Sequence, residues 1–192
     1  LHLCDRRQRQ MCIRDSSYHS QRLVVLEQVS ACYGNPPIPV SEPVTMEIRN
    51  GDRICLRGKN GCGKSSLFRL ILGEQTEAAG KIWRGSGLKI SYVSQDTSHL
   101  RGSLREYARA FQVEEHLICA LLRKLDFSRE QLEKPLEALS QGQKKKVLIA
   151  KSLCEQAHLY LWDEPLNYID IFSRIQLEQL VAVSYTHLRA HE

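Results

Sequence analysis

Alternation of apolar and polar residues predicts a small antiparallel β region in the first part of the chain. In residues 44–49, every second position is apolar and the positions between are polar, which is typical of a strand with one buried face. We expect residues 23–33 and 80–83 to complete this β region. The proline-rich run 35–39 predicts a loop.

The next pattern predicts a mixed α/β core. Residues 53–56 indicate a strand and residues 66–72 a helix, with a short glycine-rich segment between them. Together, residues 53–72, 88–95 and 158–165 are expected to supply this core, and the last of these segments is a buried apolar strand.

A helix-rich region is predicted between the core segments. Its helices are expected at residues 104–111, 114–125 and 128–133, where Ser128 and Glu130 favour a helix start. A further helix is expected after residues 139–143, running to about Glu155.

The glycine-rich segment carries candidate chemistry. Residues 58–65 fit the pattern Gly-x-x-x-x-Gly-Lys-Ser/Thr, in which glycines let successive backbone N–H groups surround one anion. Lys64 can reach the outer phosphates, the Ser65 hydroxyl can bind Mg²⁺, and the following helix N-terminus adds positive charge. A chance match is the alternative, and the strand–loop–helix context argues against it. The predicted nucleotide contacts here are Gly58, Asn60, Gly61, Cys62, Gly63, Lys64, Ser65 and Ser66.

Two carboxylates end the predicted strand 158–165. Asp163 can hold Mg²⁺ through water, and Glu164 can polarise the water that attacks the γ-phosphate. Acidic residues commonly follow strands, so this pair alone is weak evidence. The order of a phosphate loop, then Leu-Ser-Gln-Gly-Gln at 139–143, then Asp-Glu-Pro is far more specific.

With these motifs in this order, the chain resembles the ABC ATPase family over residues 22–183. The resemblance implies an α/β P-loop NTPase domain of the ABC type, with an antiparallel β subdomain and a helical subdomain that carries the signature motif. It also implies ATP and Mg²⁺ as ligands. Gln95 matches the family's glutamine that touches Mg²⁺ and senses the γ-phosphate, so it joins Glu164 as a catalytic candidate and Ser65 and Asp163 as a metal candidate.

The resemblance implies nucleotide contacts at two further places in the chain. Tyr33 matches the aromatic residue that stacks on adenine, and a strand-end tyrosine with a buried ring is nearly as good an interpretation. Ser140, Gly142 and Gln143 match the signature loop, which in this family contacts the γ-phosphate held by a partner domain. Gln141 departs from the commonest family form, which has glycine there.

Residues 161–170 resemble ABC-F proteins more narrowly. The motif Leu-Asn-Tyr-Ile-Asp, with Gly-Gln-Lys-Lys-Lys upstream, is similar to sequences of the Lsa/Vga-like antibiotic-resistance group. Residues 80–179 look most like the C-terminal ATPase domain of that group. Such proteins carry two ATPase domains on one chain, bind the ribosome and dislodge drugs. The resemblance therefore implies ATP hydrolysis, ribosome protection, and a second ABC domain and ribosomal RNA as partners. The alternatives are the nucleotide-binding domain of an ABC membrane transporter and an ATP-binding fragment without turnover.

The two ends of the chain do not share this resemblance. Residues 1–17 and 184–192 resemble translated sequencing-adapter sequence and are predicted to be a non-native leader and tail; a basic nucleic-acid arm is the alternative for the leader. The domain at 22–183 is then expected to stop before the family's switch-histidine region. The leader holds four arginines against two aspartates, and the tail holds one arginine against one glutamate. The chain's net charge is +5, so the domain between them has a net charge of +3. This charge permits ribosome contact without demanding it.

Composition adds few constraints. The lysines at 144–146 form the densest basic spot and predict a solvated helical face, with direct RNA contact as the alternative. No apolar run approaches the roughly 20 residues that span a bilayer. Seven cysteines without a Cys-x-x-Cys pair predict reduced thiols and a cytoplasmic location. Because the signature loop needs a partner domain, the chain alone is expected to hydrolyse ATP poorly.

Overall fold

The computed structural model describes residues 21–33, 38–39, 42–59, 61–74, 78–182 and 187–191. The chain divides into two compact units. Of the described residues, the first unit contains those up to 92, with 157–164 and 187–191, and the second contains 93–156 and 165–182.

An antiparallel sheet forms around the long strand β1 (Arg22–Tyr33). The strands β2 (Ile38–Pro39), β3 (Val44–Arg49) and β5 (Ala78–Arg84) all pair with β1 in the antiparallel sense. The three strands predicted from the sequence are therefore confirmed. The predicted loop at 35–39 is wrong at its end, because Ile38 and Pro39 pair with the end of β1. Residues 35–37 lie outside the described residues.

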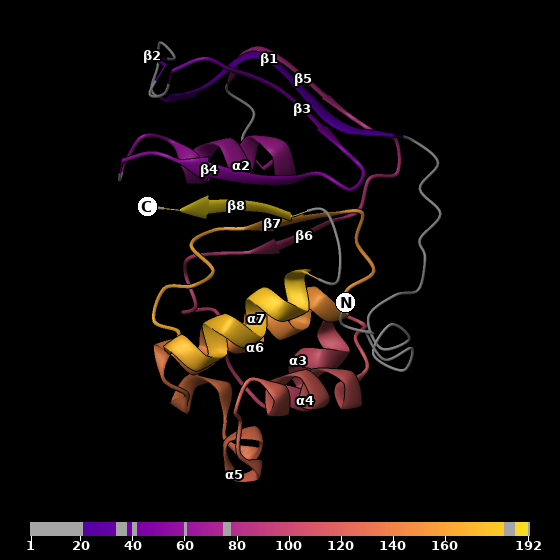
Figure 1. Cartoon of the computed structure of the whole chain (residues 1–192), viewed down its shortest axis with the longest axis vertical. Coiled ribbons are helices and arrows are strands. Elements are labelled where there is room, and N and C mark those ends of the chain that lie inside the picture. The colour runs from indigo at the N-terminus through magenta and orange to yellow at the C-terminus, as the bar shows by residue number, and fades with distance from the viewer. Residues whose placement is uncertain are drawn as a thin grey trace, which may run out of the picture. The chain divides into compact units, whose positions relative to one another are not determined.

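A second sheet in the same unit has the strand order β4 (Arg53–Arg57), β8 (His187–His191), β7 (Leu159–Trp162), β6 (Ile90–Val93). Between the two sheets lies α2 (Lys64–Leu72), as Figure 1 shows. Its buried residues Phe68 and Ile71 share one apolar cluster with Leu26 of β1 and Leu161 of β7. This shared core fixes the start of α2, and hence the phosphate loop, against both sheets.

The position of β8 differs from the sequence interpretation, which set residues 184–192 apart from the fold. Residues His187–His191 lie between β4 and β7 and pair in parallel with both. A strand at this place satisfies backbone groups on the facing edges of β4 and β7, which is a physical reason for a chain segment to fill it. The adapter-like origin of this segment remains a prediction.

The second unit is helical. Its helices α3 (Leu104–Ala110), α4 (Glu115–Lys124) and α5 (Arg129–Glu133) confirm the three predicted ones, and α6 (Gln141–Cys154) follows a short 3₁₀ turn, η1 (Leu136–Ala138). Ser103, Ser128 and Ser140 each begin a helix through a capping box, in which serine and a Glu or Gln three residues later exchange hydrogen bonds. The last helix, α7 (Ile171–Ala182), was not predicted from the sequence.

The lysines at 144–146 do not form the solvated helical face that was predicted. Lys145 and Lys146 are only 2% and 8% exposed. The Lys145 ammonium donates to the Ser94 carbonyl at 2.9 Å, and that of Lys146 donates to the Leu125 carbonyl at 3.0 Å and pairs with Asp170 at 2.8 Å. Buried ammonium groups require such partners. Two of the three lysines thus hold α6 against its neighbours, so direct RNA contact by them is also excluded.

No helix among the described residues is both long enough and apolar enough to cross a membrane.

Candidate functional site

Glycine conformations shape the phosphate loop between β4 and α2. Gly61 and Gly63 have φ values of 79° and 95°, in the left-handed region that other residues rarely adopt. Gly63 is the N-cap of α2, and the first turn of α2 contains no acidic residue. The N–H groups of that turn can therefore serve an anion. A Cβ added at Gly58 would lie 2.5 Å from the Cys62 Sγ, so a larger residue there would require the exposed Cys62 side chain to rotate away. Asn60 lies outside the described residues.

Lys64 reaches back over this loop from the first turn of α2. Its Nζ donates to the Gly58 carbonyl at 2.8 Å and to the Lys59 carbonyl at 3.4 Å. The ammonium is thereby held above the loop backbone, where it is positioned to meet outer phosphates.

Ser65 and Asp163 meet although they are 98 positions apart in sequence. The Ser65 hydroxyl donates to Asp163 Oδ2 at 2.5 Å. Ser65 comes from the first turn of α2 and Asp163 follows β7, where it is 1% exposed. A hydroxyl and a carboxylate at hydrogen-bond distance are the hard oxygen donors that Mg²⁺ prefers. The residues present therefore fit a magnesium ion at the end of the phosphate loop.

Tyr92 of β6 also belongs to this site and was not predicted from the sequence. Burial, together with the charge of Asp163, raises the pKa of Tyr92 to about 12, and its phenol is hydrogen-bonded to Asp163. A phenol with so high a pKa stays protonated at neutral pH and donates to the carboxylate. Tyr92 thus helps to orient Asp163. Its place three residues before Gln95 could have drawn attention to it, but the contact with Asp163 is not visible in the sequence.

Glu164 is held in a strained conformation. It follows Asp163 directly, is 9% exposed, and has a φ of 46° in the left-handed region. A non-glycine residue there costs free energy, and such strain is common at functional sites. The surrounding structure therefore holds the backbone of Glu164 in a conformation that it would rarely adopt by itself.

The signature residues lie in the helical unit, at the start of α6. Ser140 and Gln143 form the capping box: the Gln143 N–H donates to Ser140 Oγ at 3.2 Å, and the Ser140 N–H donates to Gln143 Oε1 at 2.9 Å. A Cβ on Gly142 would lie 2.2 Å from the Tyr168 carbonyl oxygen, so only glycine fits. The Gln141 amide oxygen accepts from the Thr97 hydroxyl at 2.6 Å, which gives this unusual residue a structural role.

The other predicted residues are placed as follows. Gln95 is exposed just after β6, beside the Ser94 carbonyl that Lys145 binds. Ser66 lies in the first turn of α2. Tyr33 ends β1, and its side chain lies outside the described part of the chain.

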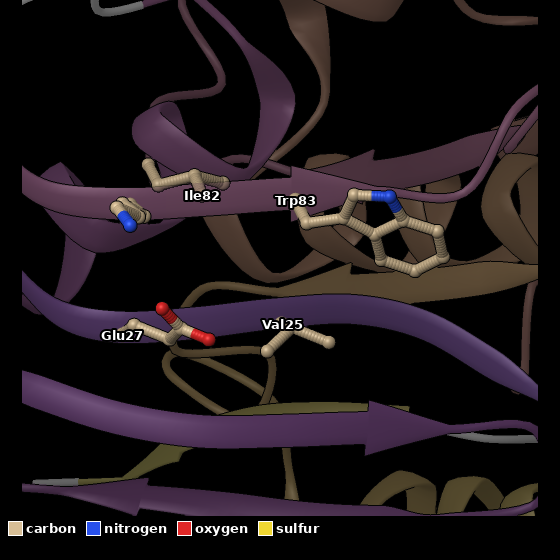
Figure 2. Close-up of a pocket in the computed structure, with 5 residues that line it drawn as sticks. Val25, Glu27, Ile82 and Trp83 are labelled. Carbon is tan, nitrogen blue, oxygen red and sulfur yellow. The ribbon is translucent and has the colours of Figure 1, made fainter.

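A separate hollow lies on the exposed face of the antiparallel sheet. It has a volume of about 450 Å³ and is lined by Val25, Glu27, Lys81, Ile82 and Trp83. Figure 2 shows these side chains on β1 and β5. The predicted nucleotide ligands do not line it, so it is distinct from the phosphate loop.

Comparison with known families identifies the fold. Residues 41–167 match the family described as ABC transporter. The chain belongs to this family. A solved structure of a cobalt transport ATP-binding protein, cbiO-2, is similar with a TM-score of 0.73 and 20% identity over 88% of this chain and 70% of its own. The fold is therefore the ABC-type P-loop NTPase that the motifs predicted. ABC ATP-binding domains bind ATP, normally with Mg²⁺, generally hydrolyse it, and work in pairs.

Similar proteins have different roles. ATP-binding protein Uup of Buchnera aphidicola is 33% identical over 72% of this chain and 24% of its own length. Ribosome protection protein VmlR of Bacillus subtilis is 28% identical over 84% of this chain and 30% of its own. Zinc import ATP-binding protein ZnuC of Photorhabdus laumondii is 30% identical over 86% of this chain and 65% of its own length. The chain thus spans about a quarter to a third of Uup and VmlR.

Cys62 gives a first test of the nucleotide site. Its thiol is exposed within the phosphate loop, whereas Cys119 and Cys154 are partly buried. Burial raises the pKa of the Cys119 thiol, which makes it less reactive. We expect an alkylating reagent to modify Cys62 ahead of Cys119 and Cys154, and Mg·ATP to slow this reaction severalfold. Peptide mass spectrometry measures both rates, and the exposed Cys55 is the control that ATP should not protect.

The alternative is that Cys62 is only a small residue tolerated at a variable loop position. A Cys62 that stays unmodified without nucleotide, or that ATP does not protect, would support this alternative and leave the ABC assignment unchanged.

Proposed function

We propose that this chain is the ATP-binding and ATP-hydrolysing domain of an ABC-F protein that acts on the ribosome and protects it from antibiotics. The catalytic part rests on one observation, the hydrogen bond that joins Ser65 of the phosphate loop to Asp163 after β7. This hydrogen bond brings the two predicted magnesium ligands together. Each ligand adjoins another predicted site residue in the sequence: Lys64 precedes Ser65, and Glu164 follows Asp163.

Each residue then has a defined task. Lys64 and the loop N–H groups bind the phosphates, and Ser65 and Asp163 hold the magnesium ion, with Gln95 as a third predicted ligand. When bound, the ion neutralises charge on the phosphates. Glu164 accepts a proton from the attacking water. Ser140, Gly142 and Gln143 contact the nucleotide of the paired domain, and Tyr33 stacks on adenine.

The ribosomal role rests on two observations. The sequence of residues 161–170 resembles that of Lsa/Vga-like ABC-F proteins, and a ribosome protection protein is among the similar chains. Because Lys145 and Lys146 are buried, ribosomal RNA must be contacted elsewhere on the whole protein. We place this protein in the cytoplasm, because seven cysteines without a Cys-x-x-Cys pair indicate reduced thiols.

A transporter ATPase is the second candidate, because ZnuC and cbiO-2 are also similar. Both candidates use the same ATP residues, so only the partner distinguishes them.

The deciding experiment is ribosome sedimentation with the longer protein that carries this domain. With Glu164→Gln and Mg·ATP, we expect the protein to pellet with ribosomes, and we expect Lys64→Ala to remove it from the pellet. A protein that binds ATP but stays in the supernatant, or that co-purifies with a membrane subunit, contradicts the ribosomal role.

A further inference from the structure

The segment 94–98 follows β6, carries Gln95 and is shaped by hydrogen bonds between its own residues. The Ser94 hydroxyl donates to the Asp96 carbonyl at 2.6 Å. The Asp96 carboxylate accepts from the Ser98 N–H at 2.8 Å and from the Ser98 hydroxyl at 2.7 Å. Such side-chain bonds to near neighbours fix a turn without help from a strand or helix. The exposed Gln95 therefore lies at the start of a segment with a defined backbone.

Two further hydrogen bonds tie this segment to the first half of α6. The Lys145 ammonium donates to the Ser94 carbonyl at 2.9 Å, and the Thr97 hydroxyl donates to the Gln141 amide oxygen at 2.6 Å. These contacts lie one residue before and two residues after Gln95. Lys145 is 2% exposed and Thr97 is 5% exposed, so both bonds form away from water, where hydrogen bonds are stronger. Helix α6 thus holds the backbone on both sides of Gln95.

The bond from Lys145 fixes the backbone at Gln95 itself. The Ser94 carbonyl and the Gln95 N–H belong to one planar peptide unit, which ends at the Gln95 Cα. A donor that holds the Ser94 oxygen therefore also sets the direction in which the chain enters Gln95. A buried ammonium is costly without acceptors, and a bond from a charged donor is stronger than a neutral one, so this contact resists breaking. The neighbouring Lys146 binds other partners, so the two buried lysines have different tasks.

The contact with Thr97 depends on the unusual residue of the signature motif. Glycine, the commonest residue of the family at position 141, has no side-chain oxygen that could accept from Thr97. Gln141 supplies that acceptor. The departure from the family form and the hydroxyl at position 97 are therefore complementary, and together they form a link that the commonest motif cannot make.

We propose that Lys145 and the pair Thr97 and Gln141 are positioning residues, which hold Gln95 where it can bind the magnesium ion of Mg·ATP. This role rests on the proposed function, in which Gln95 is a third ligand of that ion. A ligand whose backbone is already fixed loses less conformational freedom when it binds the ion. Residues that orient a metal ligand raise the affinity for the metal without touching it. The expected effect is therefore confined to the part of ATP affinity that depends on Mg²⁺.

The first test compares ATP binding with Mg²⁺ and with EDTA, by calorimetric titration of the 192-residue chain. Lys145→Met removes the ammonium but keeps an unbranched side chain. We expect it to weaken binding of Mg·ATP by about tenfold, at the lower end of the usual loss when a residue that orients a metal ligand is removed. Binding of ATP in EDTA should change less than about twofold, because Gln95 then has no ion to bind. Lys144→Met makes the same change one position earlier on α6 and is the matched control, with both affinities unchanged.

Thr97 supplies a second pair of variants, which decides the question if Lys145→Met unfolds the chain in a thermal scan. Thr97→Val keeps the shape of the side chain and removes the hydroxyl, whereas Thr97→Ser keeps the hydroxyl and removes the methyl group. We expect Thr97→Val to weaken Mg·ATP binding by about threefold or more, as for the loss of one neutral hydrogen bond, and Thr97→Ser to preserve it. The opposite order would make Thr97 a packing residue and overturn its positioning role.

Gln95→Ala shows whether Lys145 acts through Gln95. In the Gln95→Ala chain, Lys145→Met should weaken Mg·ATP binding by less than about twofold, because residues that act as one unit are not additive. An equal loss in both backgrounds, or an equal loss with Mg²⁺ and with EDTA, makes Lys145 a support of the fold alone and overturns the inference. An unchanged affinity in the Lys145→Met chain overturns it as well.

Two results separate this inference from the proposed function. If Gln95→Ala leaves the affinity for Mg·ATP unchanged, Gln95 is not a magnesium ligand in this chain, and the inference fails while the phosphate loop keeps its role. If the unaltered chain binds no ATP with Mg²⁺ or with EDTA, the proposed function fails together with the inference.

Discussion

Replacing Lys64 with alanine is expected to weaken binding of Mg·ATP by about two orders of magnitude. The Lys64 ammonium lies 2.8 Å from the Gly58 carbonyl, directly above the phosphate loop. A bound triphosphate offers this ammonium charged acceptors, and charge-assisted hydrogen bonds are worth roughly 1.5–3 kcal/mol each. Loss of one or two such bonds corresponds to about a hundredfold or more in affinity. Calorimetric titration with Mg·ATP measures the change.

Lys59→Ala is the matched control for this experiment. It removes the same charge from the same loop, but Lys59 is exposed and contributes its backbone carbonyl to the contact with Lys64. We expect an affinity change of less than about fivefold, since exposed charges are strongly screened. Thermal unfolding of both variants checks that the fold is retained. Equal ATP affinity in the Lys64→Ala and unaltered chains would remove Lys64 from the phosphate site.

Local patterns in the sequence predicted most of the elements correctly. The alternation at 44–49 coincides with β3, and Ser128 begins α5 as its hydroxyl suggested. These features depend on contacts between near neighbours in the chain, such as a serine that caps the third N–H after it. The phosphate loop is equally local, because its glycines act through their own backbone angles.

Contacts between distant segments could not be predicted in this way. The lysines at 144–146 look like a polar helix face, yet two of them are buried because Ser94, Leu125 and Asp170 offer acceptors there. The orientation of Asp163 by Tyr92 likewise requires two strands to be brought together. Residues 187–191 form β8 because the sheet offers two strand edges, and nothing in their own pattern indicates it.

The signature motif combines a contact between near neighbours with a contact between distant segments. Its order in the sequence indicated the family, and a helix was expected after residue 143; the helix in fact begins inside the motif, with Ser140 as its N-cap. The reason for glycine at 142 emerges only with the Tyr168 carbonyl against it. A motif therefore identifies which residues matter before the structure explains why a particular residue type is needed.

Replacing Glu164 with glutamine is expected to leave ATP affinity within a few-fold and to lower turnover by about 10²–10⁴, the usual contribution of a general base. Glutamine keeps the size of the side chain in its buried position, but it cannot accept the proton of the attacking water. Because ABC domains work in pairs, turnover is measured as phosphate release by a protein that contains both domains. Glu130→Gln, an exposed change on α5, should leave the rate unchanged.

The closed, ATP-bound form should accumulate in the Glu164→Gln protein, because its nucleotide is bound but not consumed. Turnover equal to that of the Glu130→Gln protein would show that another group takes the proton. If turnover falls only in proportion to a lost ATP affinity, Glu164 serves binding and not the chemical step.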